Sequence, residues 1–213
     1  MNFLNNLLRR YPVLLQILKF AAIGALNTAL DFIILNFITK TFNISSGFEL
    51  GLLNVVSFSA AVVQSYYWNK AWAFATSASA TLFQNFFRLV MVGGLGFVAF
   101  VAVFLGAAHD ASNLFYLLIL VGFIVVELIL WKAFNLKLGS GSGASTQFAG
   151  FIVVSIIGLV INSVIIVVAT KYITPYLEFS INADSIKNVA KILATVVSLV
   201  WNFIGYKLIV FKK

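Results

Sequence analysis

Long runs of apolar residues separated by short polar breaks dominate the chain. The runs lie near residues 17–39, 50–72, 85–107, 114–134, 147–171 and 188–211. Each has about 20 residues or more, the length that an α-helix needs to cross a hydrocarbon core about 30 Å thick. The pattern therefore predicts an all-α, polytopic integral membrane helix bundle with six transmembrane helices, which leave little room for a soluble domain.

Two segments outside these runs have a composition of their own. Residues 1–15 place Phe3 and three leucines on one side of a short helix and Arg9 and Arg10 on the other, as in an amphipathic helix at a membrane interface. A frayed terminus is the alternative. Residues 139–145 read GSGSGAS, the composition of a flexible linker. The predicted parts are then the interfacial helix 1–15, helix hairpins at 16–76, 77–138 and 146–213, and the linker at 139–145.

The apolar runs share a short internal pattern. The first, third and fifth runs carry matching positions at offsets of 4, 7 and 11 from an aromatic residue or leucine, a spacing that returns to one face of a helix. Small residues on such a face let helices approach closely in lipid. The three sets are Phe20, Gly24, Asn27 and Asp31; Leu89, Gly93, Gly96 and Phe100; and Phe151, Ser155, Gly158 and Asn162.

The second and sixth runs end alike. Residues 65–74 read SYYWNKAWAF and residues 198–211 read SLVWNFIGYKLIVF, so both contain Trp-Asn and then a lysine four residues before a phenylalanine. The fourth run ends in the looser LWKAF. We therefore expect three hairpin repeats that enter from the same membrane face, the outer two similar and the middle one degenerate.

The charges are few and unevenly placed. Hydrophobic residues make up 62% of the chain and charged residues 9%, against about 25% charged in soluble proteins. An even number of spans puts both termini on one side, and that side holds most of the lysines and arginines, so we expect both termini in the cytoplasm. These residues are Arg9, Arg10, Lys19, Lys70, Arg88, Lys132, Lys137, Lys207, Lys212 and Lys213. The opposite side has Lys40, Lys171, Lys187 and Lys191 interleaved with Glu49, Asp110, Glu178 and Asp184.

Several kinds of catalytic site are missing from the sequence. Without cysteine there is neither a disulfide framework nor a thiol nucleophile. His109 has no cluster of metal ligands around it, and GSGSGAS lacks the Lys-Ser/Thr of a phosphate-binding loop. The few acids are too scattered for a Ser-His-Asp or two-carboxylate site. We expect no enzyme activity, no metal, no cofactor and no nucleic-acid partner.

Two acidic residues fall inside the predicted spans. A carboxylate near the bilayer centre costs about 2.5–3.5 kcal/mol on insertion scales, so Asp31 and Glu127 should face protein or water. Asp31 has two possible roles. It either serves the transported substrate, by contacting a sugar headgroup or by carrying a coupled proton, or it joins helices through hydrogen bonds to polar neighbours. Those neighbours are Asn27, Asn54 and Asn162. Glu127 either lines a translocation path or is partly neutralised near an interface.

These motifs resemble the GtrA-like family of small membrane proteins. The segments KFAAIGALNTALDF with SYYWNKAWAF, and FIVVSIIGLVIN with AKILATVVSLVWNFIGYKLIVFKK, look like the two halves of a family member and cover about 125 residues. A typical member has four spans, so residues 82–138 would form two extra spans between the halves. The resemblance implies cell-surface polysaccharide or glycolipid assembly, in which family members are proposed to translocate polyprenyl-phosphate-linked sugars.

Such a lipid needs cations at headgroup depth, bordered by aromatic and apolar surface. Lysine binds phosphate as a point charge, and arginine can bind two phosphate oxygens. Asparagine can hydrogen-bond to phosphate or sugar hydroxyls, and tryptophan can stack on a sugar ring. The candidate residues are Lys70, Lys207, Arg88, Lys132, Asn69, Asn202, Trp68, Trp72 and Trp201. The alternative is an interfacial belt of aromatic anchors and snorkelling lysines.

Three functions remain open at this point. The preferred one is a flippase for a polyprenyl-phosphate-linked sugar or for the polyprenyl phosphate carrier, in the cell membrane of a bacterium or archaeon. The second is a non-transporting membrane anchor or partner of a polyprenyl-phosphate glycosyltransferase. The third is a small proton-coupled cation or drug exporter. The expected partners are the lipid-linked sugar, membrane lipids and a membrane glycosyltransferase. Four glycines leave room for close helix packing, either within one protomer or between the protomers of a homo-oligomer, namely Gly24, Gly93, Gly94 and Gly96.

Overall fold

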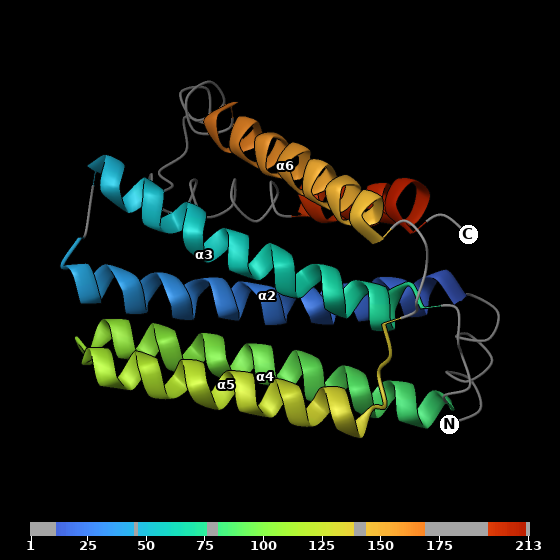
Figure 1. The fold of residues 1–213 in the computed structure, drawn as a ribbon, viewed down its shortest axis with the longest axis horizontal. Coiled ribbons are helices and arrows are strands. Elements are labelled where there is room, and N and C mark those ends of the chain that lie inside the picture. The colour runs from blue at the N-terminus through green and yellow to red at the C-terminus, as the bar shows by residue number, and fades with distance from the viewer. Residues whose placement is uncertain (1–11, 45–46, 76–80, 139–143, 169–195, 212–213) are drawn as a thin grey trace, which may run out of the picture. The chain divides into compact units, whose positions relative to one another are not determined.

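The computed structural model describes residues 12–44, 47–75, 81–138, 144–168 and 196–211, and every regular element in these ranges is a helix (Figure 1). The chain divides into two compact units, Met1–Ser140 and Gly141–Lys213. The all-helical prediction is confirmed for the described ranges. The predicted interfacial helix falls mostly on residues 1–11 and the predicted linker mostly on residues 139–143, outside these ranges. Residues 12–15 and 144–145, at their edges, instead belong to the long helices that begin at residues 12 and 144.

Unit 1 is built around one long helix. Its elements are α2 (Pro12–Phe42), α3 (Gly47–Trp68), the π-helical turn η1 (Asn69–Ala73), α4 (Leu82–Ala108) and α5 (Asn113–Ala133). Helix α2 packs against α3, α4 and α5, so it lies at the centre of this unit (Figure 1). Its side chains Ile23, Leu26 and Ile33 are fully buried and form the core.

Many helices carry large apolar side chains on their outer surfaces, as helices in contact with lipid do. Within the described ranges, three helices are long and apolar enough to cross a membrane, namely Val13–Phe42, Phe83–Ala108 and Asn113–Ala133. Two shorter apolar helices follow at Ser145–Ile161 and Val196–Val210. The chain is an integral membrane protein. The count of six spans stays a prediction.

The helix ends follow from local residue choice. Pro12 opens α2, where its fixed φ and missing N–H cost nothing. Thr81 and Gln84 form a reciprocal capping box at the start of α4, and the side chain of Ser112 caps α5. Asn43 and Asp110 have positive φ beyond the ends of α2 and α4, a conformation that Asn and Asp adopt more readily than most residues.

Helices α2 and α4 touch backbone to backbone at Gly96. A Cβ atom at this position would lie 2.7 Å from the carbonyl carbon of Ala25 and from the nitrogen of Leu26. No side chain larger than hydrogen fits there. Gly96 is the third member of its predicted set, so that position does serve close helix packing.

Unit 2 pairs α6 (Ala144–Val168) with the helix of residues 196–205 and the π-helical turn η4 (Tyr206–Val210). The rings of Phe151 and Tyr206 stack with centroids 4.0 Å apart, and the hydroxyl of Tyr206 lies 2.6 Å from Ser155 Oγ. Trp201 Nε1 donates to the carbonyl of Val154 at 3.1 Å. These contacts fix the register between the two helices.

The two similar sequence endings both form π-turns. In η1 the Phe74 amide donates to the carbonyl of Asn69 at 2.9 Å, and in η4 the Phe211 amide donates to that of Tyr206 at 2.7 Å. Each turn begins one residue before the lysine of the Lys-x-x-x-Phe ending. π-Turns are rare and occur mostly as single turns within α-helices, often at functional sites. The shared turn supports the predicted relation between the first and last hairpins, which stays a prediction.

Candidate functional site

Two half-buried cations from different helices lie near each other at one end of unit 1. They are Lys19 on α2 and Arg88 on α4, which lie within electrostatic reach of each other. Among the described residues neither forms an ion pair with an acidic side chain. Because like charges repel, this arrangement favours a bound anion between them.

Aromatic groups border both cations. Lys19 Nζ lies 5.7 Å from the centroid of the Trp72 ring. The guanidinium carbon of Arg88 lies 5.2 Å from the centroid of the Phe134 ring, and its Nη2 donates to the Phe134 carbonyl at 3.0 Å. That bond uses one of the five N–H groups of the arginine and orients the rest. A cation pair held against aromatic rings suits an anion at the boundary of lipid and water.

The π-turn η1, which contributes Trp72 to this cluster, has two buried polar atoms without partners among the described residues. Trp72 is 3% exposed and its Nε1 meets no acceptor in the described part of the chain. Asn69 is fully buried; its Nδ2 donates to Ser65, while its Oδ1 has no donor among the described residues. An unmet buried donor or acceptor costs about 1–3 kcal/mol. Trp72 Nε1 is thus a donor that an oxygen-rich ligand would satisfy.

Two of the predicted phosphate lysines, Lys70 and Lys207, lie over aromatic rings of their own helices. Lys70 Nζ lies 3.3 Å from the hydroxyl of Tyr66 and 5.5 Å from its ring centroid. Lys207 Nζ lies 5.7 Å from the ring centroid of Phe203. Each ring belongs to the residue four positions earlier, which is the arrangement expected of an interfacial anchor. Lys70 belongs to unit 1 and Lys207 to unit 2, so the joint binding of one lipid phosphate by the two lysines stays a prediction.

Glu127 on α5 is joined to α3. It accepts hydrogen bonds from Gln64 Nε2 and from the side chain of Trp68. The ring of Trp68 also meets that of Trp131 on α5, with centroids 5.4 Å apart. The half-buried acid therefore has polar partners, as an acid in a membrane helix requires. Lys132, one residue after Trp131, is exposed.

Asp31 is joined to α3 as well, by a hydrogen bond from the buried Ser57. Its Oδ1 and the Oδ1 of Asn27, one helical turn earlier, are buried and have no partner in the described residues. The three polar side chains form a stripe between α2 and α3. The sequence pointed to Asn27, Asn54 and Asn162 as partners, whereas the observed partner is Ser57.

The two Trp-Asn dipeptides occupy different positions relative to their π-turns. Asn69 immediately precedes Lys70, whereas Asn202 lies five residues before Lys207. Asn202 faces Gly158 of α6, where a Cβ atom would collide with its side chain, and its Oδ1 lacks a partner within the described ranges. Trp201 is engaged with Val154. The side chains of Asn54 and Asn162 lie outside the described residues, as does Lys191.

Sequence reasoning missed Lys19, Ser57 and Gln64 as site residues. Lys19 could have been found from the repeat itself, because it directly precedes Phe20 as Arg88 directly precedes Leu89. In unit 2 the equivalent residue is Gly150. Ser57 and Gln64 carry no such signal. Among the described residues no group of three or more metal-ligating side chains occurs.

The comparison with known proteins assigns the chain to a family. The model of the GtrA/DPMS transmembrane domain matches twice, over residues 19–136 and over residues 129–211. The first match runs without interruption through α2–α5, so the hairpin at 82–138, which the sequence suggested as an addition between two halves, lies inside it. Neither a curated protein nor a solved structure gave a match. On these two matches the chain belongs to the GtrA/DPMS transmembrane domain family.

Proposed function

We propose that the protein moves a polyprenyl-phosphate-linked sugar, or the spent polyprenyl phosphate, between the two leaflets of its membrane. Membership of the family connects the chain with the handling of lipid-linked sugars. The observation that carries the proposal is the pair Lys19 and Arg88, which lie near each other and have no acid partner in the described part of the chain. The lipid phosphate is the anion that this pair would bind.

The surroundings of the pair fit a lipid phosphate. Arg88 keeps N–H groups beyond the one bound to Phe134, and lysine adds a mobile point charge. The ring of Trp72, which borders Lys19, also carries an Nε1 donor that has no acceptor among the described residues. The apolar outer surfaces of α4 and α5 begin beside this cluster and can accept the isoprenoid chain, since Phe86 and Phe87 are exposed.

The path for the polar headgroup is proposed along the stripe of Asn27, Asp31 and Ser57. The opposite route, between α2 and α4, is closed where Gly96 meets the backbone of Ala25. Asn27 and Asp31 lie eight and twelve residues from Lys19, about 12 and 18 Å along the helix, so the stripe lies near mid-membrane. Buried carbonyl and carboxylate oxygens without partners offer hydrogen-bond acceptors to sugar hydroxyls.

A reconstituted leaflet-exchange assay tests this function. Vesicles loaded with a fluorescent polyprenyl-phosphate sugar would be followed with wild-type protein and with the double variant Lys19→Gln, Arg88→Gln. We expect exchange by the wild type and a loss of at least tenfold in the variant. The matched control is Lys137→Gln, which removes an exposed lysine just beyond α5 and should exchange lipid normally. Equal exchange by wild type, double variant and protein-free vesicles would favour the anchoring alternative.

A further inference from the structure

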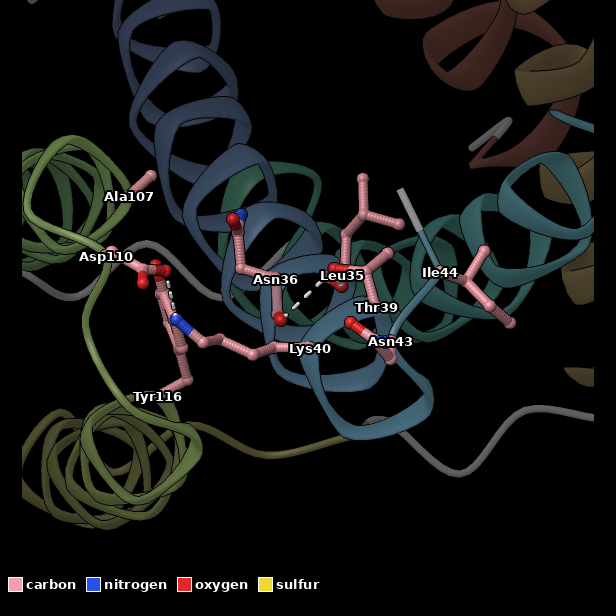
Figure 2. A pocket seen from close by; sticks show the side chains of 9 residues that line it. All are labelled: Leu35, Asn36, Thr39, Lys40, Asn43, Ile44, Ala107, Asp110 and Tyr116. Atoms are coloured by element: carbon pink, nitrogen blue, oxygen red, sulfur yellow. Dashed lines mark hydrogen bonds and ion pairs between the residues drawn. The ribbon is translucent and has the colours of Figure 1, made fainter. Parts of the chain in front are cut away.

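A polar cavity lies at the end of unit 1 opposite to Lys19. It has a volume of about 420 Å³, and α2, α4 and α5 all contribute to its wall (Figure 2). This volume falls in the range of about 300–1,000 Å³ that is usual for small-ligand sites. The lining residues are Leu35, Asn36, Thr39, Lys40, Asn43, Ile44, Ala107, Asp110 and Tyr116.

The charges in this cavity cancel. Lys40 Nζ donates to Asp110 Oδ1 at 2.6 Å, so the cation of α2 is paired with the carboxylate that follows α4 (Figure 2). Among the described residues these two are the charged side chains that line the cavity. A phosphate would have to compete with Asp110 for Lys40. The cavity therefore differs from the Lys19 and Arg88 cluster, where two cations lack such a partner.

The remaining polar groups suit hydroxyls. Asn36 and Asn43 offer amides, and Tyr116 contributes a phenol from α5 (Figure 2). Asn36 donates its Nδ2 to the carbonyl of Phe32 at 2.8 Å, which holds the amide in place and leaves its oxygen for a ligand. Amides, a carboxylate and an ammonium group can each donate to or accept from a sugar hydroxyl.

The distance to the cation pair decides which part of a lipid the cavity would hold. Lys40 is 21 residues beyond Lys19 on the same helix, about 30 Å at 1.5 Å per residue, which is the thickness of a hydrocarbon core. One lipid headgroup cannot occupy both places at once. The cavity thus lies at the opposite membrane face from the cation pair.

We propose that this cavity is a binding site for the neutral sugar ring of a lipid-linked sugar at the opposite membrane face. The inference rests on the proposed function for its ligand class, since it names the place where the sugar is held on that face. A sugar bound there leaves its phosphate outside the cavity and its isoprenoid chain in lipid. The site would discriminate a sugar-bearing lipid from the bare carrier.

Thiol labelling tests the proposal, because the chain has no cysteine of its own. The variant Ala107→Cys puts a single thiol on the cavity wall, and Ala108→Cys, one residue on and outside the lining, is the matched control. Each variant is reconstituted in nanodiscs and labelled with a polar maleimide. The probes are polyprenyl-phosphate glucose, mannose and N-acetylglucosamine, with sugar-free polyprenyl phosphate as comparison.

We expect at least one sugar-bearing lipid to slow labelling at position 107 threefold or more, while the sugar-free lipid does not and position 108 is unaffected. Adding Asn36→Ala should remove the protection without lowering the unfolding midpoint, since in the described part of the chain that side chain bonds within its own helix. Equal slowing by lipids with and without sugar, or none by the three sugar lipids, would overturn the inference.

The two tests fail separately. Protection at position 107 without leaflet exchange would leave the sugar site standing and reject translocation. Leaflet exchange that depends on Lys19 and Arg88, with no protection of position 107 from labelling, would support translocation and reject the sugar site.

Discussion

Phe20 of α2 and Phe74 at the end of η1 meet edge to face, with ring centroids 6.5 Å apart and ring planes 61° apart. In unit 2, Phe151 and Phe211 meet in the same way, at 6.3 Å and 62°. Phe20 and Phe151 are the first members of their predicted sets, and Phe74 and Phe211 close the Lys-x-x-x-Phe endings. The same ring contact thus follows a π-turn in both units.

The ring pair should stabilise unit 1. Both Phe20 and Phe74 are more than nine-tenths buried, so Phe74→Ala should lower the free energy of unfolding by about 3 kcal/mol. Phe74→Leu, which keeps most of the volume, should cost less. The control is Phe86→Ala, which truncates an exposed ring on α4 and should have little effect. Thermal unfolding in detergent measures all three, and a Phe74→Ala midpoint equal to that of wild type would contradict the prediction.

Gly96 should be far less tolerant of substitution than its neighbour Gly94. In Gly96→Ala the new methyl group would meet the backbone of Ala25, so α2 and α4 must separate, at a cost of about 1–3 kcal/mol. A methyl group at Gly94 meets no atom within 4 Å, and Gly94→Ala should be neutral or stabilising by up to about 1 kcal/mol. Unfolding midpoints compare the two variants. Equal destabilisation by both would show that the close contact is absent.

The link between Gln64 and Glu127 should appear as a coupling energy. A double-mutant cycle with Gln64→Leu and Glu127→Leu should give an interaction of about 1 kcal/mol, typical of polar pairs between membrane helices. Glu127→Gln should be milder than Glu127→Leu, because an amide oxygen still accepts from Gln64. Chemical unfolding in mixed micelles measures these values. Additive single-variant effects would mean that the pair contributes nothing.

The pair of Lys40 and Asp110 should persist in mild acid. The hydrogen bond from Lys40, and then its charge, lower the pKa of Asp110 below the ordinary aspartate value, while Tyr116 lies nearby on α5. A depressed carboxyl pKa gives stability that is present above the unfolded pKa of about 4 and is lost as the pH falls through the folded pKa. The midpoint difference between wild type and Asp110→Asn should thus stay constant from pH 5 to 8 and shrink below pH 4. A difference that vanishes already near pH 6 would contradict this.

The helices could be predicted from the sequence because their signal is local. Apolar runs of the right length placed each described helix to within several residues, and both Lys-x-x-x-Phe endings fall on a π-turn. The π-turns were not predicted, since the turn depends on how Phe74 and Phe211 pack against another helix. The cost of a carboxylate inside a membrane likewise indicated that Asp31 needs a polar partner, but only the packing of α2 against α3 identifies Ser57.

The candidate site was predicted in part for the same reason. Arg88 and the aromatic residues were found from their positions at span ends, and Lys70 was found with them. Lys19 was counted only among the basic residues, because its nearness to Arg88 depends on α2 and α4 lying side by side. The polar cavity around Lys40 gave no sequence signal, since its wall combines residues 35–44 with residues 107–116, which lie far apart along the chain.

The π-turns also affect how the length of such hairpins can vary. A π-turn holds one residue more than an α-helical turn, so deleting one residue within Asn69–Ala73 would leave an ordinary α-turn with the same packing on either side. The same deletion earlier in α3 would rotate every later side chain by about 100°. Alignments of related hairpins should therefore place single-residue gaps inside these helices, at the two π-turns, rather than in the connecting loops.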